Sequence, residues 1–125
     1  MVKLSFDNIV EQFVQLSGCS PQQTASIVGL IENAQRRISI LLDEKKCSAR
    51  SIASAEYAAA VYAFYDYVCA CNAKEKIIVT LTGNASANTD YKSRIESAKD
   101  LRESALKAIE PVMLGCDFLF RTVEG

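Results

Sequence analysis

The segment that most constrains the fold of this chain is a run of alanine and aromatic residues near its middle. It predicts one helix over Ser51–Asn72, which would be about 33 Å long. Alanines recur along this segment, and four tyrosines and a phenylalanine surround its axis on more than one face. A helix that is apolar nearly all round is buried, and alanines let its neighbours approach closely. We therefore predict a central helix around which the others pack.

Length and composition predict a single domain over residues 1–125. A chain of 125 residues suffices for one core, and 50% hydrophobic with 23% charged residues is typical of a globular protein. A net charge of -1 supplies no basic excess for nucleic acid or anionic membranes. The first residues do not resemble a secretory leader, and no stretch approaches the ~20 apolar residues of a membrane span. We expect a cytosolic protein with no membrane contact.

Two helices are predicted before the central one. The first covers Ser5–Ser17, and Gly18 is well placed to end it. The second covers Pro21–Glu44, because Ser20 can cap it, proline suits the first helical position and an apolar stripe of helical period follows. These boundaries predict an all-α fold, an antiparallel bundle of about four helices.

The sequence changes character after the central helix. Ile77–Thr82 is rich in β-branched residues and predicts an extended strand, and Gly83–Asp90 is rich in turn-forming residues. Together they predict a β-hairpin-like insertion over residues 76–90. Because an isolated hairpin is only marginally stable in water, we expect this insertion to project or to meet another chain.

A fourth helix is predicted from about Asp90 or Ser93 to Glu110, where Pro111 disfavours further helical geometry. Its period places five apolar residues inward and five basic residues outward: Ile95, Ala98, Leu101, Ala105 and Ile109, and Lys92, Arg94, Lys99, Arg102 and Lys107. The tail, residues 115–125, is unusually apolar and aromatic for a chain end. It would either fold back on the bundle or dock on a partner subunit.

The commonest general base and metal ligand, histidine, is missing from the sequence. The chain has no histidine, so neither a Ser-His-Asp nor a Cys-His arrangement can be built, and no glycine-rich phosphate-binding motif occurs. Five cysteines without a regular framework predict reduced thiols. Cys69 and Cys71 would supply half of a zinc site at most, so buried small thiols are the favoured interpretation. We expect no enzymatic activity, no cofactor and no metal.

Two carboxylates interrupt the apolar central helix. A buried Glu56 or Asp66 would need a partner, and an ion pair with Arg36, Arg37 or Arg50 is expected. The tyrosines could be read as a platform for stacking bases. Such platforms usually lie in a basic groove, so core packing with hydroxyls reaching the surface is favoured instead.

The order of these elements resembles the head–tail connector (adaptor) proteins of tailed bacteriophages and prophages. The best-matching parts are Tyr57–Tyr65 in the central helix, the Ile77–Thr82 segment, and Ala105–Pro111 leading to Phe118–Phe120. This resemblance implies a structural virion protein of the neck, assembled in the bacterial host cytoplasm. It would form a ring of its own copies, commonly twelvefold, between the portal protein and a tail-side neck protein, and DNA would pass through without specific binding.

The alternative is a cytosolic helical-bundle module that binds one protein partner, as a regulatory or inhibitory subunit does. In the connector interpretation, the insertion and the tail contact neighbouring subunits or the portal. The interface candidates are Ile77, Ile78, Val79, Thr80, Leu81 and Thr82 in the insertion, and Phe118, Leu119, Phe120, Arg121 and Val123 in the tail.

Overall fold

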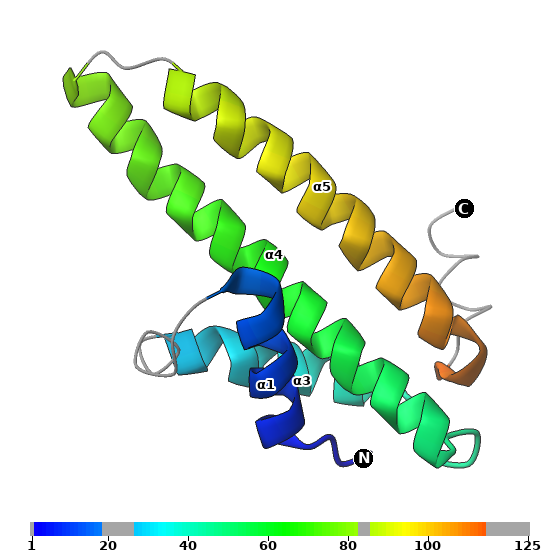
Figure 1. Ribbon diagram of the computed structural model, residues 1–125. Coiled ribbons are helices and arrows are strands. Elements are labelled where there is room, and N and C mark those ends of the chain that lie inside the picture. The colour runs from blue at the N-terminus through cyan, green and yellow to red at the C-terminus, as the bar shows by residue number, and fades with distance from the viewer. Residues whose placement is uncertain (1, 19–26, 83–85, 115–125) are drawn as a thin grey trace.

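The computed structural model describes residues 2–18, 27–82 and 86–114, with the backbone alone described over residues 72–82 and 86–91. Within these ranges the secondary-structure elements are helices, which confirms the predicted all-α class, and the predicted strand is absent. Figure 1 shows a long antiparallel pair of helices, with two shorter helices packed on one half of it. The elements in chain order are α1 (Phe6–Ser17), α3 (Val28–Leu41), α4 (Ala49–Thr82), α5 (Ser86–Ile109) and the short 3₁₀ helix η2 (Glu110–Val112).

Helix α1 begins and ends where local chemistry predicts. The Ser5 hydroxyl accepts a hydrogen bond from the backbone N–H of Asn8 at 3.3 Å, which satisfies one of the free donors of the first turn. Gly18 ends the helix in the left-handed region, with φ 72°, and its N–H donates to the Val14 carbonyl. Glycine enters that region without a steric penalty.

Helix α3 is shorter than predicted. It covers Val28–Leu41 instead of Pro21–Glu44, because Ile27, with φ -119°, precedes it as a non-helical cap and Leu42 is extended. The predicted capping serine lies outside the described residues. Leu42 leaves the helix to form an antiparallel bridge with Met113, so a long-range contact decides where α3 ends.

This bridge joins the end of α3 to the chain segment that follows α5. The Asp43 N–H donates to the Val112 carbonyl at 2.8 Å, and the Leu114 N–H donates to the Leu41 carbonyl at 2.6 Å. These bonds satisfy backbone groups that have no partner in either helix. They also hold the chain beside α3 up to Leu114.

Helix α4 overturns the predicted β-hairpin. It spans 34 residues, Ala49–Thr82, and the predicted strand Ile77–Thr82 forms its last turns. Extending an existing helix adds a backbone hydrogen bond per residue without a new nucleation step, whereas a strand here would have no sheet to join. The helix penalty of β-branched residues, at most ~0.7 kcal/mol each, is too small to reverse that balance.

Helix α5 also begins earlier than predicted. It spans 24 residues from Ser86, so most of the predicted turn Gly83–Asp90 is helical as well, while residues 83–85 lie outside the described ranges. Its end is confirmed, because α5 stops at Ile109 and Pro111 lies in the first turn of η2. Within the predicted insertion, residues 76–82 and 86–90 are therefore helical.

The core surrounds the first half of α4, as the alanine pattern predicts. Five alanines there are at most 1% exposed, and α4 contacts each of α1, α3 and α5. Phe13 of α1 packs edge-on against Tyr67 of α4, with ring centres 5.7 Å apart. Small side chains on the shared helix let three neighbours approach it together. The five alanines are Ala55, Ala58, Ala59, Ala60 and Ala63.

The distal parts of α4 and α5 extend beyond α1 and α3. Figure 1 shows the green and yellow ends of the two helices continuing side by side, past the region where α1 and α3 pack. At about 1.5 Å per residue, α4 is about 51 Å long. None of the described helices combines the length and apolar character that crossing a membrane requires.

Candidate functional site

The structure places the interface residues predicted for the insertion at the tip of the helical hairpin. Ile77–Thr82 closes α4, and Ser86 opens α5. The structure describes the backbone of these residues. The five candidates in the tail lie outside the described residues: Phe118, Leu119, Phe120, Arg121 and Val123.

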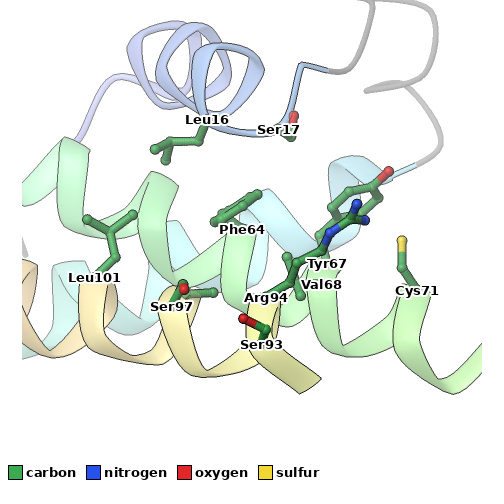
Figure 2. Close-up of a pocket in the computed structure, with 11 residues that line it drawn as sticks. Leu16, Ser17, Phe64, Tyr67, Val68, Cys71, Ser93, Arg94, Ser97 and Leu101 are labelled. Atoms are coloured by element: carbon green, nitrogen blue, oxygen red, sulfur yellow. The ribbon is translucent and has the colours of Figure 1, made fainter. Parts of the chain in front are cut away.

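An open groove lies between the end of α1 and the middle of the α4–α5 pair (Figure 2). Its volume is about 600 Å³, within the ~300–1,000 Å³ range of ligand-binding clefts. In Figure 2, α4 lies across the back of the groove, α1 and α5 flank it, and α3 lies behind α4. The lining residues are Leu16 and Ser17 of α1, Phe64, Tyr67, Val68 and Cys71 of α4, and Ser93, Arg94, Ser97, Ala98 and Leu101 of α5.

The groove combines an apolar floor with small polar side chains along one edge. Phe64 and Leu101 are half-buried and Val68 is buried, whereas Ser93 and Ser97 on α5 are exposed. Such a surface suits a ligand that buries apolar side chains and forms hydrogen bonds with hydroxyl groups. The described residues that line the groove include no carboxylate to pair with a base.

A second, smaller hollow adjoins the groove at Leu101. Its volume is about 280 Å³, and it continues along α4 and α5 toward the end of α5. The α5 residues that line it are again small. The other lining residues are Ser54, Tyr57, Ser104, Ala105 and Ala108.

A cluster of arginine and tyrosine side chains joins α3, α4 and α5. The Arg37 side chain donates a hydrogen bond to the Tyr62 hydroxyl at 3.0 Å. The Arg102 guanidinium carbon lies 4.0 Å from the centre of the Tyr65 ring and 5.5 Å from that of Tyr62. Stacking on an aromatic face suits the planar guanidinium, and explains why Arg102 is half-buried where the sequence pattern predicts an outward side chain.

Asp66 lies within the electrostatic reach of the same cluster. Burial raises the pKa of Asp66, while the positive charges of Arg102 and Arg37 oppose that shift. Arg37, one of the expected partners, thus acts on Asp66 electrostatically, and so does Arg102, which the helical period had placed outward. A hydrogen bond with the Cys69 side chain raises the pKa of Tyr65. The electrostatic effect of Cys69 and the burial of Tyr65 raise it further.

Glu56 has a different role from the expected ion pair. Its side chain is 6% exposed, and its carboxylate accepts hydrogen bonds from the Ser5 backbone N–H at 2.5 Å and the Asn8 side-chain amide at 3.2 Å. Both donors lie at the start of α1. Glu56 therefore anchors the N-terminus of α1 to α4. Its negative charge also interacts favourably with the positive end of the α1 dipole.

The cysteines whose side chains are described are free thiols. Cys47, Cys69 and Cys71 are each half-buried and form no disulfide. Burial and the carboxylates of Asp43 and Glu44 raise the pKa of Cys47, which keeps this thiol protonated. Among the described side chains, no group of three or more histidines, cysteines or acids is arranged to hold a metal ion.

Sequence reasoning missed the groove. Its signal was the spacing of small residues on α5, which places Ser93, Ser97, Ser104 and Ala108 along one face together with Leu101. The groove itself depends on where α1 ends against α4, which helical periodicity does not predict.

Comparison with known proteins adds no family to these observations, because no family model, no curated protein and no solved structure matches this chain.

Proposed function

We propose that this protein is a structural subunit of a phage head–tail connector (adaptor) ring, which joins the portal protein to a tail-side neck protein and lines the DNA passage. In this proposal the chain catalyses no reaction and binds no cofactor. Its partners are other copies of itself and the two neck proteins, and it acts in the virion after assembly in the bacterial host cytoplasm.

The observation that carries this proposal is the projecting α4–α5 hairpin. α1 and α3 pack along the first half of α4, while the distal parts of α4 and α5 continue past them (Figure 1). A projecting helical pair supplies two unlike faces in one subunit, which a closed ring needs because its interfaces are head-to-tail. The apolar sequence of Ile77–Thr82 places β-branched residues at this tip.

The near-neutral charge also supports a passive role around DNA. A net charge of -1 provides no excess of cations to hold phosphates. A passage lined by such subunits would let DNA move through without being retained.

Negative-stain imaging of the purified full-length protein at high concentration tests the proposal. Rings with a central hole are expected, and their symmetry would give the copy number. Analytical ultracentrifugation of the same sample measures whether the particles have the mass of a closed ring. Purely monomeric or dimeric particles, both alone and mixed with purified portal protein, would argue against a connector.

Removing the tail gives a second test. A chain ending at Leu114 keeps the bridge between Leu42 and Met113, so it should retain its helical signal and cooperative unfolding. It should nevertheless fail to join virions. Infectious particles that contain the shortened subunit would show that the tail has no part in assembly.

The groove supports a second candidate, a helical module that binds one protein partner. An open groove with an apolar floor, flanked by helices, is the kind of surface that receives an apolar segment of another protein. This candidate predicts a monomer or dimer without ring symmetry, so the same imaging separates the two functions.

A further inference from the structure

The groove between α1, α4 and α5 has the chemistry of a receptor for an aromatic peptide segment. Phe64, Val68 and Leu101 provide apolar surface, and the smaller Ser93 and Ser97 leave open space at its edge. Their hydroxyls can bond the backbone of an extended segment lying along α5. The described part of the chain leaves this space open (Figure 2).

The chain itself contains a segment that fits this description. Residues 115–125 follow the last described residue, Leu114, and include the consecutive residues Phe118, Leu119 and Phe120. Two aromatic side chains and a leucine in succession offer a large apolar area that a groove can bury. The charged residues Asp117 and Arg121 flank these three on either side. This arrangement suits a short apolar motif that is buried at an interface with a solvated rim.

The point where the described chain ends favours the tail of a neighbouring copy. Leu114 is bonded to Leu41 at the end of α3, whereas the groove opens on the side of α4 away from α3 (Figure 2). A tail reaching its own groove would have to pass around α5. The shortest such path is half the circumference of a helix ~10–12 Å wide, which is roughly 16–19 Å. Four extended residues span at most about 14 Å, so Phe118 of the same chain falls short.

We propose that residues 115–125 of one copy dock in the groove of the next, with Phe118, Leu119 and Phe120 against Phe64, Val68 and Leu101. This inference rests on the proposed function, since it names the contact by which one ring subunit holds its neighbour. The tail and the groove are different surfaces of one subunit, so the contact is head-to-tail and can be repeated around a ring.

Photo-cross-linking in the full-length protein tests this contact. A diazirine amino acid with a short aliphatic side chain, which leaves room for the tail, replaces Ser97, an exposed residue of the groove, and isotopically heavy and light chains are mixed in equal amounts before irradiation. Mass spectrometry should find residue 97 linked to residues 115–125, with about half of these products joining a heavy chain to a light one, as random pairing of neighbours requires. The same probe at Lys99, which is exposed on α5 and outside the groove, should not give this product.

Two results would overturn the inference. Links that join only chains of the same label would show that each tail binds its own groove, and links that miss residues 115–125 would show that another segment occupies it. Imaging of the same sample separates this result from the proposed function. Rings without the link between residue 97 and the tail overturn the inference alone, whereas mixed-label links without rings support the contact and count against the connector.

A groove-filling variant provides an independent measurement. Ser97→Trp places a large side chain where the neighbour's tail would lie, so the dissociation constant of self-association should rise roughly tenfold or more, about 1.4 kcal/mol. Lys99→Trp is the matched control at an exposed position of the same helix. Thermal unfolding confirms that both variants fold, and unchanged self-association of the Ser97 variant would overturn the proposal.

Discussion

The anchoring of α1 by Glu56 leads to the most direct test of the packing. The Glu56 carboxylate accepts a hydrogen bond from the Ser5 N–H at 2.5 Å and another from the Asn8 amide at 3.2 Å, and the side chain is 6% exposed. Hydrogen bonds to a charged group contribute about 1.5–3 kcal/mol each. Losing a cap costs helices about 0.5–2 kcal/mol.

Glu56→Ala removes both bonds and leaves a small cavity against α1. We expect the free energy of unfolding to fall by about 3 kcal/mol, less than the sum of the two bonds because water can reach the exposed Ser5 and Asn8. Glu56→Gln keeps one oxygen that can accept from the Ser5 N–H but loses the charge. Its expected loss is about 1–2 kcal/mol.

Urea unfolding followed by far-UV circular dichroism measures both variants. Glu11→Gln, which changes an exposed carboxylate on α1, is the control and should stay within about 0.5 kcal/mol of wild type. A double-mutant cycle with Asn8→Ala isolates the side-chain bond. If Glu56→Ala were no more destabilising than the Glu11 control, the anchoring role would be refuted.

Three further substitutions test other parts of the structure. Burial raises the pKa of Asp66, so its contribution to stability is greatest below the ordinary value of 3.8 and is lost as the pH rises through the folded value. Asp66→Asn should therefore gain stability relative to wild type between pH 3 and pH 7 in urea unfolding, and a constant difference would contradict this. Arg102→Lys loses the planar stacking on Tyr65 and should cost about 0.5–1 kcal/mol, and an equal loss for exposed Lys107→Ala would show that stacking is not the cause. Gly18→Ala should cost about 1 kcal/mol because φ is 72°, and the cost is one of backbone conformation because an added Cβ meets nothing within 4 Å. Gly18→Asn should cost less, because asparagine enters the left-handed region more readily than alanine, and equal losses would exclude the backbone explanation.

The candidate site was only partly predictable from sequence. Arg37 was among the expected partners of Asp66, because a carboxylate inside an apolar helix needs a nearby cation. Arg102 was assigned to solvent by helical period, although it stacks on Tyr65. The predicted arginine partner of Glu56 was also wrong. A backbone N–H at the start of a helix can satisfy a carboxylate just as an arginine can, and composition does not reveal which N–H will lie nearby.

The errors in the fold arose where local preference and tertiary context disagree. The β-branched residues of Ile77–Thr82 favour a strand locally, but they follow a helix that is already formed and α5 lies alongside it. Continuation of the backbone hydrogen bonds outweighs a small propensity difference at each residue. The end of α3 was also set by a distant partner, since Leu42 pairs with Met113.

Sequence alone determined the features that depend on neighbouring residues. The all-α class, the buried central helix with its alanines, both ends of α1 and the stop before Pro111 follow from helical period, capping chemistry and proline geometry, which act within a few residues. Only the tertiary structure decided the length of the α4–α5 hairpin, the anchoring of α1 on Glu56 and the groove beside Leu101. These features depend on segments far apart in the chain, and their free energies come from contacts that no local pattern specifies.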